Sequence, residues 1–210
     1  MEWKSITTRG DLLWLMFTQL TPHVQVAIKA GKEILGGKYN VETASSFLFS
    51  AAVVGDFFWP SEGRDRNKFD VADAFPDRAR DMRHLLGLPD SAPTDLDRIR
   101  NDLTHVDERL EELFVQDPDG PMIAWGDGSK AREGTRRYMN FARETGILHS
   151  LGREINVGEV VAWLENLLAR ASRVSFELML RHPNLGSGGE EPVQEGEGES
   201  SHRDDAHEDR

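Results

Sequence analysis

The spacing of apolar residues along the chain predicts helices. Apolar side chains recur at three- and four-residue steps over residues 11–35, the period of one buried helix face, and Pro22 is expected to kink or divide this helix. Residues 41–58 are apolar on most sides, which is typical of a central bundle helix. A shorter third helix is predicted over residues 76–86, before Gly87.

A fourth helix is predicted over residues 95–115. On a wheel of about 100° per residue, its apolar residues fall within about 100° of one another and form a buried stripe. These residues are Leu96, Ile99, Leu103, Val106, Leu110, Leu113 and Phe114. Pro93 precedes the helix, Thr94 is expected to cap it, and Asp97 stands three residues on as a weaker capping-box partner. We therefore expect one continuous amphipathic helix with a polar outer face.

The pattern changes after this helix. Residues 116–128 are rich in Pro, Gly and Asp and are predicted to form a loop. Short strands are predicted over 138–142, 146–152 and 153–157. Asn156 and Glu159 resemble a capping box for a last helix that continues through Leu180. The predicted fold class is mainly α, a bundle of about five helices with a small β-strand element before the last helix and a disordered acidic C-terminal tail.

Charge divides the chain into two parts. Residues 186–210 hold nine acids and two arginines, a net charge of −7, and this Gly- and Ser-rich tail is expected to be disordered. The chain as a whole carries −12, which leaves −5 on the helical domain over 1–185. An acidic body is not expected to bind nucleic acid in general, although it is compatible with a local basic site.

Composition also narrows the class of protein. There is no cysteine, which excludes disulfides, cysteine-ligated zinc and a thiol nucleophile. The most apolar stretch, residues 47–60, is interrupted by Asp56, and no membrane span is expected. The N-terminal residues do not have the pattern of a signal peptide, and the expected location is the cytoplasm.

The polar face of the predicted fourth helix carries candidate chemistry in Arg98, Arg100, Asn101 and His105. Histidine titrates near neutral pH and can take a proton from a ribose 2′-hydroxyl. A guanidinium group can hold a phosphate through two parallel hydrogen bonds. The alternative interpretation is a solvated helix face, because charge pairs four residues apart occur on any exposed helix.

Arg100 and His105 have the spacing R-x4-H, with the polar Asn101 after the arginine. This arrangement resembles the active-site motif of the HEPN superfamily, helical-bundle proteins that include many metal-independent endoribonucleases. The resemblance covers roughly residues 10–181. It implies that His105 acts in proton transfer, that Arg100 binds or stabilises the scissile phosphate, and that Asn101 orients the site. Toxin-type members often have tyrosine two residues after the histidine, whereas this chain has Asp107, and regulation through such a tyrosine is not expected.

The resemblance also implies a site shared between two subunits. Arg100 and His105 lie about 140° apart on a continuous helix, so a second copy of the helix is expected to complete the phosphate site. Arg98, seven residues before His105 and nearly eclipsed with it, is a reserve phosphate contact. The expected partners are therefore a second copy of the chain and RNA.

The resulting functional hypothesis is a metal-independent HEPN-type endoribonuclease of bacterial toxin or defence type. The alternative is a non-catalytic HEPN-like module that dimerises or binds a partner; an unknown protein partner or inhibitor fits either function. No cofactor and no metal is expected. Two Asp-x-x-His pairs, Asp81 with His84 and Asp102 with His105, have the spacing of metal ligands, but the apolar face of the third helix directs the first pair outward. A basic cluster is interpreted as an RNA path or as a solvated face; it consists of Lys130, Arg132, Arg136, Arg137, Tyr138 and Arg143.

Overall fold

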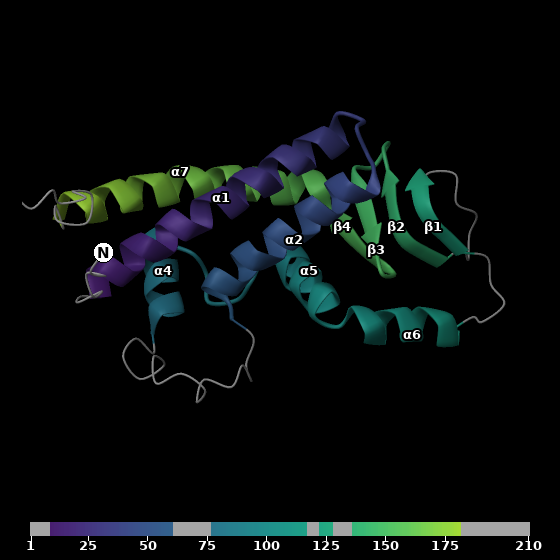
Figure 1. Cartoon of the computed structure of the whole chain (residues 1–210), viewed down its shortest axis with the longest axis horizontal. Coiled ribbons are helices and arrows are strands. Elements are labelled where there is room, and N and C mark those ends of the chain that lie inside the picture. Colours follow the sequence, from purple (N-terminus) through teal and green to yellow (C-terminus); the bar gives the residue numbers. More distant parts are fainter. Residues whose placement is uncertain (1–8, 61–76, 117–121, 128–135, 182–210) are drawn as a thin grey trace, which may run out of the picture.

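The computed structural model describes residues 9–60, 77–116, 122–127 and 136–181. Within these ranges the chain forms six helices: α1 (Arg9–Leu35), α2 (Val41–Phe58), α4 (Arg78–Leu86), α5 (Thr94–Thr104), α6 (Val106–Gln116) and α7 (Val157–Arg181). It also forms four strands: β1 (Met122–Asp127), β2 (Arg136–Ala142), β3 (Ile147–Ser150) and β4 (Arg153–Asn156). The predicted fold class is thus confirmed: a mainly helical chain with a small sheet before the last helix (Figure 1).

The core lies where α1 packs against both α2 and α7. Phe17 of α1 and Phe47 and Phe58 of α2 are fully buried there. Pro22 lies inside α1 and does not divide it, contrary to one of the two outcomes expected from the sequence. Leu20 and Val24, on either side of the proline, are fully buried, and their packing holds the two halves of the helix in one element.

A glycine allows these three helices to approach one another closely. A Cβ atom on Gly31 of α1 would lie 2.4 Å from Cγ2 of Val161 on α7 and 3.1 Å from the ring of Phe47 on α2. Real Cβ atoms do not approach other atoms so closely, and a larger side chain here would push the helices apart. Gly31 therefore sets the spacing of α1, α2 and α7 near the C-terminal end of α1.

The sheet has the strand order β1-β2-β3-β4. The three predicted strands correspond to β2, β3 and β4, which form an antiparallel meander. The prediction of a loop over 116–128 was wrong at β1, which pairs parallel with β2 from Met122 to Asp127. The short run MIAW between glycine and proline residues has too little alternation to signal a strand, and its pairing comes from a segment later in the chain.

The predicted fourth helix is in fact two helices. The helical hydrogen bonding of α5 ends at His105, whose φ of −126° and ψ of 41° are not helical, and α6 begins at the next residue. Leu96 and Ile99 are 1% exposed, as the predicted stripe requires, but Leu103 is 36% exposed. Thr94 does not cap the helix, since Pro93 stands at the N-cap and makes no side-chain capping bond.

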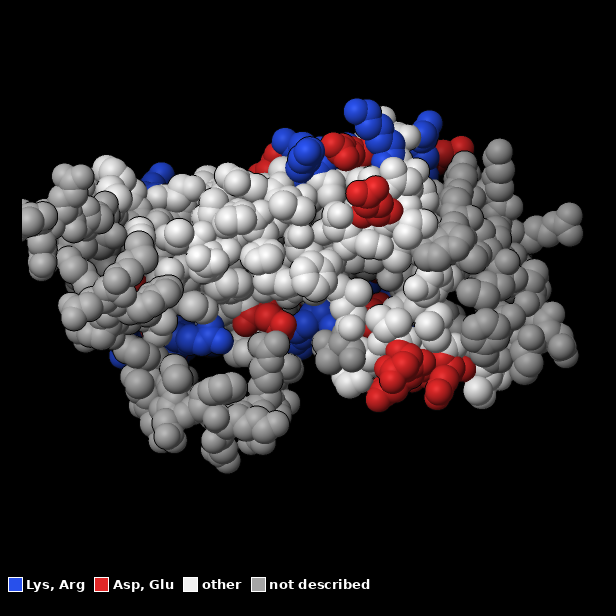
Figure 2. Space-filling view, viewed as in Figure 1, with Lys and Arg blue, Asp and Glu red and all other residues white. Residues whose placement is uncertain are grey.

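From the sequence we also expected no membrane span and a disordered C-terminal tail. By length and composition α2 could cross a bilayer, and half of this stretch is buried inside the fold. One broad face over α1 and α2 shows almost no charged side chains (Figure 2). Val26 of α1 and Phe49 of α2 are exposed apolar residues. The predicted tail over 186–210 lies outside the described residues.

Candidate functional site

Two of the predicted site residues, Arg100 and Asn101, share one carboxylate. The Arg100 Nη2 group donates to Asp97 Oδ1 at 2.5 Å, and Asn101 Nδ2 donates to Asp97 Oδ2 at 3.2 Å. Arg100 Nη2 also lies 3.3 Å from the Asn101 side-chain oxygen. The spacing of three and four residues on α5 brings these side chains onto one helix face. Asp97, expected from the sequence to serve in capping, instead orients the motif's arginine and asparagine.

Arg100 points toward the body of the protein. Its side chain is 16% exposed, and Nη1 donates a hydrogen bond to the backbone carbonyl of Trp59, directly after α2. The guanidinium thus connects α5 to the end of α2. A phosphate at this arginine would have to share the group with Trp59 and Asp97, because these acceptors already take part of its hydrogen-bonding capacity.

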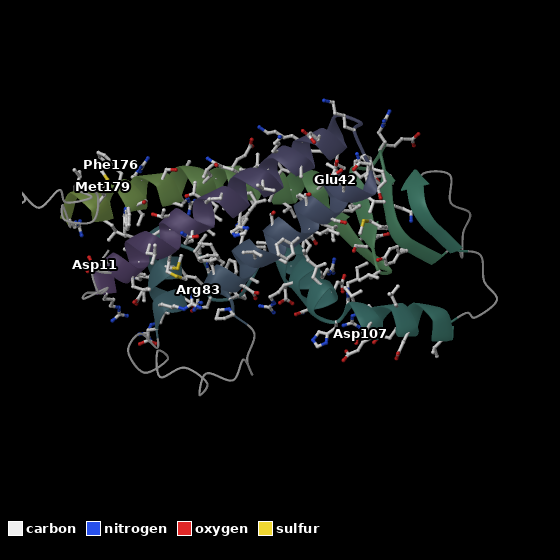
Figure 3. The ribbon with its side chains drawn as sticks, in the orientation of Figure 1. Asp11, Glu42, Arg83, Asp107, Phe176 and Met179 are labelled. Carbon is white, nitrogen blue, oxygen red and sulfur yellow. The ribbon has the colours of Figure 1, made fainter. Side chains whose placement is uncertain are left out.

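His105 lies apart from that network, at the break between α5 and α6. Its side chain is 48% exposed, and Nδ1 is 3.2 Å from Glu108 Oε2. The backbone N–H of His105 closes α5 by donating to the Asn101 carbonyl at 3.1 Å, and the carbonyl of His105 accepts from Arg109 N at 2.9 Å. Asp107, labelled in Figure 3, marks the start of α6 beside this break. The structure therefore brings Arg100 and Asn101 together and directs His105 to a different carboxylate.

Arg98, the reserve phosphate contact, is more exposed than Arg100. Its side chain is 43% exposed, with Nη1 at 3.5 Å from Asp95 Oδ1 and at 3.4 Å from the backbone carbonyl of Glu154 on β4. The sequence predicted that Arg98 and His105 lie on the same side of one helix and that Arg100 and His105 lie about 140° apart. Both predictions assume a continuous helix. The break at His105 removes the basis for both angles.

Asp102 is the site-adjacent residue whose role the sequence did not indicate. It is 1% exposed, and its Oδ1 accepts a hydrogen bond from Arg153 Nε of β4 at 2.7 Å. Arg109 Nε of α6 lies 3.6 Å from the same oxygen. Burial raises the pKa of the Asp102 carboxyl above its ordinary value, while the hydrogen bond and charge of Arg153 and the charge of Arg109 act in the opposite direction. No local pattern signals this cluster, because its arginines lie seven and 51 residues further along the chain.

The electrostatic surroundings of His105 are acidic on the α6 side. Four exposed acids lie on that helix: Asp107, Glu108, Glu111 and Glu112. Figure 2 shows acidic side chains gathered at the lower right, where Figure 1 draws α6. Arg109 pairs with Glu112 at 2.6 Å, which reduces its reach toward a ligand. An approaching phosphate therefore meets a favourable charge at Arg98 and an unfavourable field along α6.

The other candidate features lie away from this site. A cavity of about 480 Å³ between α1 and α7 is lined by Ile28, Lys29 and Leu168 among others, and contains none of the predicted site residues. In the described part of the chain, no group of three His, Cys, Asp or Glu residues could hold a metal ion. His84 is exposed on α4, and Asp81 pairs with Arg9. Of the basic cluster, Lys130 and Arg132 lie outside the described residues.

Comparison with protein-family models, with curated proteins and with solved structures gives no match for this chain. The resemblance to the HEPN superfamily therefore depends on Arg100, Asn101 and His105, and it stays a prediction.

Proposed function

We propose that this protein is a metal-independent endoribonuclease of HEPN type, in the bacterial toxin or defence class, with an active site completed by a second copy of the chain. The observation that carries the proposal is the environment of His105. The imidazole is half exposed at a helix break, and Glu108 lies 3.2 Å from Nδ1. A carboxylate at one ring nitrogen orients the imidazole and leaves the other nitrogen directed to substrate.

In the proposed reaction, His105 takes the proton of a ribose 2′-hydroxyl. The 2′-oxygen attacks the adjacent phosphorus, the bond from phosphorus to the 5′-oxygen breaks, and a second acid protonates that leaving oxygen. The products are a 2′,3′-cyclic phosphate and a 5′-hydroxyl end, and no metal is needed. In the composite site, His105 of a second subunit would be that acid, donating a proton to the leaving oxygen while the first His105 takes one from the 2′-hydroxyl.

Arginine would stabilise the negative charge that develops on the phosphate. Arg98 is the more exposed of the two candidates, whereas Arg100 is held by Trp59 and Asp97. In this proposal Arg100 and Asn101 keep the roles that the resemblance implies, phosphate stabilisation and orientation, and dimer formation would have to turn Arg100 toward the shared site.

A non-catalytic binding module is the second candidate function. It is favoured by the engagement of Arg100 with the Trp59 carbonyl and by the exposed acids of α6 beside His105. Both features make the face around His105 less suited to bind RNA. They make it better suited to bind a basic protein partner or a second copy of the chain.

RNA cleavage by the full chain distinguishes the two functions. A labelled single-stranded RNA and total cellular RNA are incubated in EDTA with wild type, His105→Ala, Arg98→Ala and Arg100→Ala. His84→Ala is the matched control, because His84 is an exposed histidine on α4. We expect wild type and the control to leave cyclic phosphate ends, and His105→Ala to lose at least about 100-fold in rate, the usual contribution of a general acid or base.

The arginine variants assign the phosphate contact. The variant that loses rate while it keeps wild-type stability identifies the arginine that acts on the phosphate. RNA that stays intact with wild type at every protein concentration, or equal cutting by wild type and His105→Ala, would contradict the proposal and favour the binding module.

A further inference from the structure

Asp102 joins three elements at one carboxylate oxygen. The residue lies on α5, three positions before the break at His105, and its Oδ1 contacts Arg153 of β4 at 2.7 Å and Arg109 of α6 at 3.6 Å. The two arginine side chains are 36% and 25% exposed, whereas the Asp102 side chain is 2% exposed. The carboxylate is thus buried beneath its two cations, and each cation anchors a different element to α5.

The attachment of α6 makes this contact important. Of the elements that the structure describes, α5 is the one that packs appreciably against α6. Val115 near the end of α6 is 77% exposed. Among the described side-chain contacts between α6 and α5, the Arg109–Asp102 pair is the one that reaches a buried charge, so we expect it to influence the direction of α6 relative to α5.

A buried ion cluster is weak evidence for added stability. Removing a carboxylate from water costs free energy that its arginines only partly return, and in some proteins such buried groups instead specify one arrangement of the elements. Asp102 fits this description, because Oδ2 is buried and makes no hydrogen bond within the described residues. The cluster is better explained by the geometry of the junction than by the free energy of folding.

We infer that Asp102 is a positioning residue for His105: by holding Arg109 of α6 and Arg153 of β4, it sets the angle between α5 and α6 and so the place of the imidazole between them. The effect on α6 stands on the contacts alone, and its consequence for catalysis rests on the proposed ribonuclease function. Asp102 does not act on substrate, since it is buried and acts through the backbone of the junction.

The substitution Asp102→Asn tests this inference with little change in shape. The amide oxygen can still accept the hydrogen bond from Arg153, whereas the charge that attracts Arg109 is lost. Arg109→Gln removes the same contact from the α6 side, together with the ion pair between Arg109 and Glu112 within α6. Glu111→Gln is the matched control, because it makes the same carboxylate-to-amide change on an exposed residue of α6 that has no ion pair in the described part of the chain.

Amide hydrogen exchange and the NMR signal of the His105 Cε1 proton report on the junction directly. In Asp102→Asn and in Arg109→Gln we expect amides of residues 107–116 to exchange about tenfold faster, with amides of α1 and α7 unchanged, because both variants lose the charged contact between Asp102 and Arg109. The His105 signal should shift in both variants, and Glu111→Gln should match wild type in exchange and in the His105 signal.

Cleavage then separates the two proposals. If wild type cleaves RNA, Asp102→Asn should lower kcat at least about tenfold with little change in KM, because misplacement of a catalytic group by about 1 Å is costly. Unchanged exchange over residues 107–116 in both variants would overturn the role of Asp102, whatever the activity. A wild type that cleaves no RNA would overturn the ribonuclease proposal, and faster exchange in the two variants would still support the role of Asp102 at the junction.

Discussion

At the scale of single residues, the environment of a side chain separates groups that look equivalent along the chain. Arg98 and Arg100 are two residues apart, yet the first is 43% exposed and the second is 16% exposed and bound to the Trp59 carbonyl. Asp97 and Asp102 also differ in their surroundings. Asp97 accepts hydrogen bonds from Arg100 and Asn101, whereas Asp102 is buried beneath arginines from two other elements. Residue type therefore indicates the available chemistry, while burial decides which group can meet a ligand.

Asp102 makes a specific prediction for the dependence of stability on pH. Burial raises the carboxyl pKa in the folded chain above its unfolded value of about 3.9, so the folded state binds the proton more readily. The contribution of Asp102 to the free energy of unfolding therefore falls as pH rises from the pKa in the unfolded chain through the pKa in the folded chain. At higher pH this contribution stays constant. Asp102→Asn removes this dependence, and the stability of the variant relative to wild type should rise with pH across that window.

Urea unfolding of both proteins at several values between about pH 4 and pH 7 measures this difference. Glu111→Gln, which changes an exposed carboxylate, serves as the reference for general charge effects. A relative stability of Asp102→Asn that falls as pH rises would mean that the arginines stabilise the carboxylate more than burial opposes it.

At the scale of elements, close approach and helix breaks decide how the helices are placed. Gly31 lets α1 lie against Val161 of α7 and Phe47 of α2. The break at His105 turns one predicted helix into two and leaves α6 attached through its junction with α5. The capping box, in contrast, is local: the Asn156 side chain accepts from Glu159 N at 3.2 Å and starts α7 where the sequence predicted.

We expect Gly31→Ala to lower the free energy of unfolding by up to about 2 kcal/mol. Alanine favours a helix over glycine by about 1 kcal/mol, but the new Cβ would lie 2.4 Å from Val161 Cγ2, and overpacking of this kind costs about 1 to 3 kcal/mol. Chemical denaturation of the single variant measures the loss.

The double variant Gly31→Ala with Val161→Ala identifies the cause. Removing the valine methyl groups makes room for the new Cβ, so the second change should cost less in the Gly31→Ala background than in wild type. Equal costs in both backgrounds would show that the two positions do not clash.

At the scale of the whole molecule, net charge and self-association oppose each other. The chain carries −12, so two copies repel at long range, and this repulsion is screened over about 10 Å at 0.1 M salt. The proposed active site nevertheless needs two copies of His105. Dimer formation should therefore be weak at low ionic strength and stronger as salt increases.

We expect sedimentation velocity to show a larger dimer fraction at about 0.3 M salt than at about 0.05 M salt, because the Debye length is shorter at the higher concentration. Specific cleavage activity, measured at one fixed salt concentration, should rise with protein concentration in step with the dimer fraction. Full activity in a protein that sediments as a monomer would contradict the composite site and require one chain to supply every group.

Much of the fold follows from local patterns. Residues 41–58 were predicted with the observed bounds of α2, and the strands β2 to β4 and the start of α7 follow from short-range alternation, glycine turns and a capping box. Gly146 and Gly152 have positive φ values of 70° and 78° in the turns between these strands, conformations that glycine adopts without strain. The sequence by itself also determined which residue types could carry chemistry, in Arg98, Arg100, Asn101 and His105.

Only the tertiary structure decided how those residues are placed. The parallel pairing of β1 with β2, the inward direction of Arg100 and the burial of Asp102 all depend on partners far along the chain: residues 136–141 for β1, Trp59 for Arg100 and Arg153 for Asp102. The break at His105 lies beside the last of these contacts. Periodicity reports which face of an element is apolar, and it carries no information on which distant polar group will meet that element, because the ion pairs and hydrogen bonds concerned form only after the elements pack.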